Sequence, residues 1–404
     1  MPTTANDRPI RTSSSRSVAR CVAIVAIAAA VFILAPVAVA SAADDGDGLS
    51  PSERAQMVAA GWITGAYLFA TGTTIGSFLN VVVYRLPRGQ DLRRPKSRCP
   101  RCQTQLRWYD NLPVIGWLLV GGRCRYCQAS ISPRYPLVEA ACGAWFLLLG
   151  HLELLSGGGC LPLRAVPRMT GALWIVWSPQ WELIGIYVYH LVLTCWLLVL
   201  ASWVWDRQRL PARAVVWLLA MGMLPAVVWP NLRPVGAWGT TLTAETVNYT
   251  AVALRTSNWT SGIIDGLVGL AIGACIGSAL AAEVGRPSHG GVTPFGAWHV
   301  TVMLAAVGLF LGWQAAVAVT LPTAIVAASV IVVSGGCRQT ALAAMAYSTF
   351  VATLAFTVSW RFWTQMLAWL VRGPSPGAVT ALVFVVFAGA VCRSVIRRRP
   401  APTT

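Results

Sequence analysis

Long apolar runs alternate with short polar segments along nearly the whole chain of 404 residues. Most of these runs are about 17–25 residues long, the length that an α-helix needs to cross a hydrocarbon core of roughly 30 Å. The pattern therefore predicts an all-α polytopic membrane protein with about nine transmembrane helices. The predicted spans are 61–84, 135–154, 182–203, 212–229, 260–283, 298–313, 315–334, 341–360 and 376–392.

The N-terminal segment differs from the later spans. Residues 1–20 are polar and contain four arginines, and an apolar run from Cys21 to about Ala40 follows. The run ends in small residues, before an acidic stretch. A basic start, an apolar run and a small-residue site are typical of a signal peptide. An uncleaved anchor helix explains residues 1–43 equally well.

Composition and charge support the membrane prediction. The chain is 56% hydrophobic and only 11% charged, which is too little charge to cover a soluble protein of this length. Its net charge of +17 does not indicate nucleic-acid binding, because the basic residues lie between apolar runs. Such residues gather in cytoplasmic loops. We therefore expect the basic loop 85–134, Asp206, the loop 284–297 and the tail 393–404 to share the cytoplasmic face.

Four of the eleven cysteines form two pairs in the loop 85–134. Cys99 and Cys102 form the first pair and Cys124 and Cys127 the second, in the pattern C-x2-C-x21-C-x2-C. Two such knuckles complete a tetrahedral four-thiolate site, which suits structural Zn²⁺ because no position stays open for substrate. Chance pairing in a reducing compartment and a redox C-x-x-C are the alternatives.

Three stretches resemble the bacterial prepilin peptidase family. The first, Gly76–Pro87, reads GSFLNVVVYRLP and is similar to the family signature at the end of the first helix. The second runs from Ser97 to Glu139 and contains both cysteine pairs. The third, Asp265–Gly269 with Leu304–Trp313, is similar to the family's late glycine-rich helices.

The resemblance implies an aspartic endopeptidase of the bacterial inner membrane. Its partners would be the leader peptides of type IV prepilins or type II secretion pseudopilins and the lipid bilayer. Many family members also methylate the new N-terminus with S-adenosylmethionine. The resemblance divides the chain into an N-terminal region with the zinc loop at 61–154, a helical membrane domain at 182–392 and the basic tail.

The catalytic half departs from the family pattern. The family uses two aspartates, one of them in G-x-G-D, and this motif is absent. His299 stands where the second aspartate belongs, and Asp206 lies two residues after the position of the first, which falls on Val204. These two residues are the catalytic candidates. A pseudo-peptidase of the same fold is the alternative function, whereas a transporter lacks support because no acid is expected in mid-membrane.

Overall fold

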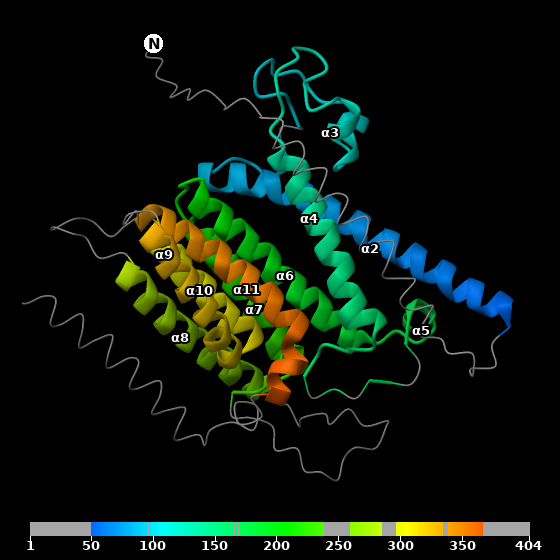
Figure 1. Cartoon of the computed structure of the whole chain (residues 1–404), viewed down its shortest axis with the longest axis vertical. Helices are drawn as coiled ribbons and strands as arrows, with labels where there is room; N and C mark the ends of the chain where they lie inside the picture. The colour runs from blue at the N-terminus through cyan, green and yellow to red at the C-terminus, as the bar shows by residue number, and fades with distance from the viewer. Residues whose placement is uncertain are drawn as a thin grey trace, which may run out of the picture. The chain divides into compact units, whose positions relative to one another are not determined.

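The protein is described by a computed structural model over residues 50–94, 97–162, 164, 166–167, 170–237, 259–284, 296–333 and 338–366 (Figure 1). These residues form helices, with two isolated β-bridges and no longer strand among them. The longer helices are α2 (Pro51–Arg85), α4 (Arg134–Leu149), α6 (Trp181–Trp205), α7 (Ala212–Val228), α8 (Trp259–Val284), α9 (Ala297–Leu311), α10 (Trp313–Val333) and α11 (Arg338–Met366). The predicted all-α fold is confirmed.

Six helices are long and apolar enough to cross a membrane, so the chain is a multi-pass membrane protein. They are Pro51–Arg88, Arg134–Leu155, Trp181–Trp205, Trp259–Ala282, Trp313–Val333 and Thr340–Thr364. The predicted spans 212–229 and 298–313 correspond to the shorter apolar helices α7 and α9. The predicted segment 1–43, the span 376–392, the tail 393–404 and most of the loop 284–297 lie outside the described residues.

The chain divides into two compact units, Met1–His151 and Leu152–Thr404. In the first unit α2 packs against α4 through small residues. A Cβ atom at Gly72 would lie 2.7 Å from the Cys142 carbonyl oxygen, and one at Gly76 would lie 2.8 Å from the Glu139 Cα atom. Only glycine permits this approach, which is the usual packing of membrane helices. The close pair fixes both ends of the segment between α2 and α4.

That segment, residues 89–133, is the four-cysteine loop. It contains the short helices η2 (Tyr109–Asn111) and α3 (Ile115–Leu119), and it continues directly into the start of α4 (Figure 1). Its fold is mostly turns, as a polar segment without a core of its own requires. The loop therefore depends on side-chain ligands and on its attachment to the helix pair.

In the second unit, α6 to α11 form a helical bundle, in which α8 and α9 pack most intimately (Figure 1). A Cβ atom at Gly269 would lie 2.0 Å from the Gly308 carbonyl oxygen, and one at Gly273 would lie 2.2 Å from that of Leu304. The glycines at three- and four-residue spacing in α8 thus provide close helix packing. The two parts of the third family-like stretch, in α8 and α9, face each other here.

A buried arginine joins three helices of this bundle. Arg233 is 2% exposed and follows η4 (Pro230–Leu232). Its guanidinium donates to the carbonyl oxygens of Leu309 at 2.7 Å, Gly262 at 2.6 Å and Gly222 at 3.1 Å. These carbonyls belong to α9, α8 and α7. A buried cation is tolerated when its donors are paired, so Arg233 has a structural role.

Candidate functional site

The two cysteine pairs form two knuckles of the same construction. In the first, Cys99 N–H donates to the Thr104 carbonyl at 3.0 Å, and Gln103 N–H donates to the Cys99 carbonyl at 2.9 Å. In the second, Cys124 N–H donates to the Ala129 carbonyl at 2.8 Å, and Gln128 repeats the return bond to Cys124 at 2.9 Å. One isolated antiparallel bridge closes each knuckle. The repeated geometry aims both thiols of each pair inward.

The sulfur atoms of the four predicted metal ligands lie close together. The sulfur atoms of Cys99, Cys102, Cys124 and Cys127 all lie within 4.8 Å of one another. The Sγ–Sγ distance is 3.8 Å between Cys99 and Cys127 and 3.9 Å between Cys102 and Cys124. A tetrahedral ion with metal–sulfur bonds of about 2.3 Å needs sulfur separations of about 3.8 Å. The residues therefore fit a four-coordinate metal ion.

Hydrogen bonds in the knuckles favour the thiolate form, which is the form that ligates a metal, at Cys102 and Cys124. Backbone N–H groups of Cys127 and Tyr126 lower the pKa of the Cys124 thiol. Hydrogen bonds from Thr104 lower the pKa of Cys102 to about 6. At Cys127 a backbone hydrogen bond from Ala129 lowers the pKa, but burial and the neighbouring cysteines together raise it to about 11, so this thiol keeps its proton more readily than Cys102 and Cys124.

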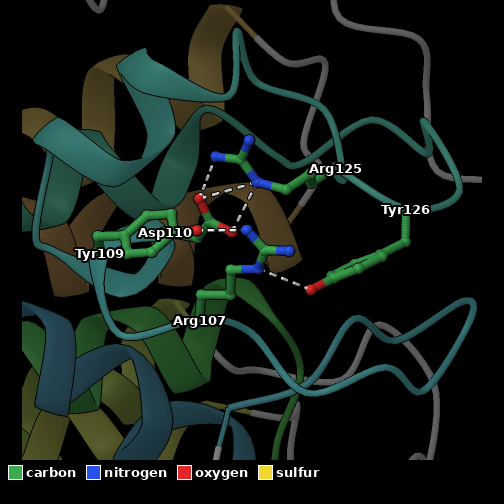
Figure 2. A network of polar contacts seen from close by, with 5 residues as sticks. All are labelled: Arg107, Tyr109, Asp110, Arg125 and Tyr126. Atoms are coloured by element: carbon green, nitrogen blue, oxygen red, sulfur yellow. Dashed lines mark hydrogen bonds and ion pairs between the residues drawn. The ribbon is translucent and has the colours of Figure 1, made fainter.

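A polar network braces the second knuckle from outside (Figure 2). Arg125 lies between the two cysteines of that knuckle in the chain. Its guanidinium donates to the Asp110 carboxylate from Nη2 to Oδ1 at 2.6 Å and from Nε to Oδ2 at 3.0 Å. The hydrogen bond from Arg125 is the main reason that the pKa of Asp110 is lowered. Arg107 donates to the hydroxyls of Tyr109 and Tyr126. The network ties the knuckle to the η2 turn that carries Asp110.

Glu139 attaches the loop to the helix pair. Its buried carboxylate, in the second turn of α4, accepts the N–H of Val114 at 2.7 Å. Val114 has a φ of 62°, an unfavourable value for a β-branched residue. The same turn of α4 lies against Gly76, in the GSFLNVVVYRLP stretch, and Asn80 of that stretch donates to the Tyr135 carbonyl at 3.3 Å. The two family-like stretches of this unit thus contact each other.

In the second unit, the C-terminus of α6 meets the N-terminus of α9. Asp206 caps α6, and the next residue, Arg207, has a φ of 52°. Gln208 N–H donates to the Trp203 carbonyl at 2.8 Å, and Arg207 N–H donates to that of Val204 at 3.3 Å. These two bonds define a Schellman turn. Asp206 is therefore held at a fixed helix end, with its side chain partly exposed.

His299, the other catalytic candidate, belongs to the same helix ends. It lies in the first turn of α9, is 3% exposed, and its ring lies against the backbone of Gln208. A Cβ atom at Gly296, the N-cap of α9, would lie 3.1 Å from Val204 Cγ1. The structure therefore brings Val204 and His299, the two positions compared with the family aspartates on sequence alone, to one region. The side chain of Glu283, a further acid, is outside the described residues.

One polar pair was not anticipated from the sequence. Glu153 lies in the π-helix η3 (Gly150–Leu155), and its Oε1 atom is 2.6 Å from Nδ1 of His190 in α6. Both side chains are completely buried. Glu153 lies two residues from the end of the candidate span Arg134–Leu155, so the pair is buried within the protein near one end of that span. Nothing in the sequence linked these residues, although a polar residue in an apolar run is itself a signal.

Comparison with known proteins identifies the region that contains the cysteine knuckles. The family model described as "Bacterial Peptidase A24 N-terminal domain" matches residues 70–152. Residues 70–152 therefore match an A24 N-terminal domain, and the family match is confined to this part of the chain. This A24 domain covers the end of α2, the whole four-cysteine loop and α4. The predicted resemblance is confirmed.

Curated relatives extend the match. A "Prepilin leader peptidase/N-methyltransferase" of Myxococcus xanthus is 52% identical over 80 residues, or 20% of this chain and 24% of the relative. A protein of the same name from Klebsiella pneumoniae is 46% identical over 97 residues, which are 22% of this chain and 42% of the relative. A "Type 4 prepilin-like proteins leader peptide-processing enzyme" of Escherichia coli is 30% identical over 211 residues, covering 48% and 66%. No solved structure matches the chain.

The chain thus spans between about a quarter and two thirds of the length of these relatives. The identity is highest where the alignment is short and falls as the alignment lengthens.

Proposed function

We propose that this protein processes the leader peptides of type IV prepilins or type II secretion pseudopilins in the bacterial inner membrane. The observation that carries the proposal is the A24 domain with all four metal ligands converged, in a multi-pass membrane chain. The names of the relatives support the same activity and substrate. Those relatives are only partly covered, so activity and substrate are carried over here as a proposal.

The proposed reaction site is the α6–α9 helix end. Hydrolysis of a peptide bond needs a base for the attacking water and a proton near the scissile carbonyl oxygen. Asp206, partly exposed at the end of α6, would take the proton of the water as the oxygen adds to the carbonyl carbon. The cleaved C–N bond then leaves its electrons on the amine, which takes the proton that Asp206 received from the water. In this scheme His299 stands in place of the second carboxyl group, and we expect slow cleavage.

The four-cysteine site would hold Zn²⁺ as a structural ion. Thiolates are soft ligands, and four of them close the coordination sphere, so the ion would organise the loop. N-methylation is proposed from the printed names of the relatives, with S-adenosylmethionine as the methyl donor. The loop, Asp206 and the basic tail would share the cytoplasmic face because Arg and Lys gather on that side.

A cleavage assay tests the proposal. Membranes containing the protein and a prepilin are incubated with S-adenosylmethionine, and mass spectrometry detects the free leader and the mature N-terminus. We expect slow cleavage by the wild type, loss of cleavage in Asp206→Asn, and wild-type cleavage in the control Asp91→Asn, an exposed acid of the four-cysteine loop. Cleavage that survives Asp206→Asn would assign the reaction to another residue. If the wild type binds the prepilin without cutting it, the protein is a pseudo-peptidase.

A further inference from the structure

The four-cysteine loop carries an exposed apolar surface, which we call the loop face. Two of its five residues flank η2, and the other three belong to α3. Their exposed fractions are large: Trp108 77%, Leu112 38%, Ile115 55%, Leu118 52% and Leu119 65%. Apolar side chains of this size on a polar loop mark a contact surface.

The short helix α3 separates an inner side from this face. Ile115, Leu118 and Leu119 are three and four residues apart, so they lie on one side of the helix. On the other side Gly116 approaches the η2 turn so closely that a Cβ atom there would lie 2.4 Å from the Asp110 carbonyl oxygen. Trp117 points inward as well and donates its indole N–H to the Ile131 carbonyl at 3.2 Å. The inner side is filled, and the loop face remains outside.

The charge of the loop is strongly positive. Residues 89–133 contain eight Arg or Lys residues and two Asp residues. One of the two acids, Asp110, is already bound by Arg125 (Figure 2). The loop face lies between two exposed arginines in the chain, Arg107 directly before Trp108 and Arg123 four residues after Leu119. An apolar surface with this charge around it suits an anionic amphiphile.

The loop is also attached at both ends to membrane-spanning helices. The candidate span that contains α2 ends at Arg88, and the one that contains α4 begins at Arg134. Because α2 and α4 pack together, the loop leaves and re-enters the bilayer at neighbouring points of one surface. A lipid headgroup layer is therefore within reach of the loop.

We propose that the loop face docks onto the membrane surface from which the loop emerges, in a bilayer containing anionic phospholipid. Trp108 and the leucines of α3 would enter the headgroup region, where tryptophan is preferred. The arginines would bind lipid phosphates, with their aliphatic stems along the apolar residues. A basic peptide would bind the loop face poorly, because its positive charges would be repelled by the arginines of the loop. The metal-held loop would then have a fixed position at the bilayer surface.

Photo-cross-linking of the full-length protein in proteoliposomes tests this docking. Benzoylphenylalanine replaces Leu119 in one variant and Gln105, an exposed residue of the first knuckle, in the control. In bilayers of equal parts phosphatidylcholine and phosphatidylglycerol, we expect lipid adducts at position 119 with phosphatidylglycerol favoured several-fold, and few at position 105. Equal lipid adducts at both positions, or an adduct at position 119 to a second copy or another segment of the chain, would overturn the proposal.

A second variant gives an independent measurement. The double substitution Leu118→Asp with Leu119→Asp changes only exposed positions, and retention of metal shows that the loop stays folded. We expect hydrogen exchange over residues 115–119 to become several-fold faster than in the wild type in the phosphatidylglycerol bilayer. Unchanged exchange would contradict docking. Arg123→Gln should reduce the preference for phosphatidylglycerol, and an undiminished preference would also contradict the charge argument.

Discussion

The four-cysteine loop and the α6–α9 helix end contrast in how completely their polar groups are arranged. In the loop, four sulfurs converge, Arg125 and Asp110 are paired, and Glu139 accepts the N–H of Val114. At the helix end, one partly exposed carboxylate and one buried imidazole lie in the region that we propose as the reaction site. The difference shows that the loop has its metal-ligating groups in place, whereas the proposed reaction site has a single carboxylate among its described side chains.

The largest effect is expected from Cys124→Ser, which removes one buried ligand of the four-cysteine site. Structural zinc sites carry about 10–16 kcal/mol of apparent binding free energy in small peptides, so the variant should lose its zinc and the loop should become sensitive to proteases. Zinc per chain is measured by mass spectrometry of the purified protein. Cys275→Ser, a lone cysteine of α8, should keep its zinc. Full zinc in Cys124→Ser would contradict the assigned ligands.

The next effect concerns the second unit. Glu153→Leu should destabilise the protein by about 3 kcal/mol, the upper end of the cost of an unsatisfied polar group, because it leaves the completely buried Nδ1 atom of His190 without its partner. Thermal unfolding in detergent measures the change. The double variant with His190→Leu should recover part of the loss. Glu182→Gln is the control, since its ion pair with Arg164 is partly exposed and is expected to contribute about 1 kcal/mol or less. If Glu153→Leu and Glu182→Gln lower the stability equally, burial does not determine the free energy lost when an acid is removed.

A smaller effect is expected at the attachment of the four-cysteine loop. Glu139→Leu leaves the buried N–H of Val114 without an acceptor, which costs about 1–3 kcal/mol. Glu139→Gln retains an acceptor oxygen and should cost less. Hydrogen exchange at Val114, together with thermal unfolding, distinguishes the two variants. If both variants exchange like the wild type, the carboxylate does not hold the loop.

The smallest effect is expected from Asp110→Asn, because Arg125 is 41% exposed and solvent screens the pair. Arg125 lowers the pKa of Asp110 below its unfolded value of about 3.9. The stabilisation is therefore present above about pH 4 and is lost as the pH falls through the folded pKa. Unfolding temperatures of wild type and variant should differ at neutral pH and converge in acid. A difference that grows in acid would reverse the assigned sign.

The sequence was sufficient for features that depend on local spacing. Two C-x2-C pairs specify a thiolate site, and apolar run length specifies membrane helices, so both could be predicted without a structure. Helix ends were less certain: α9 stops at Leu311 because Gly312 has a φ of 94°. Contacts between distant residues were beyond a single sequence. Glu153 and His190 are 37 residues apart, and no periodicity relates them.

We propose that His299 occupies the place of the second catalytic carboxyl group and limits the reaction. The most direct test is the initial rate of prepilin cleavage by His299→Asp relative to the wild type, at equal protein in the same membranes. We expect this rate to rise by orders of magnitude, because residues that act as a unit lose most of their effect when one is missing. A rate that is unchanged or lower in His299→Asp, with zinc content intact, would contradict it.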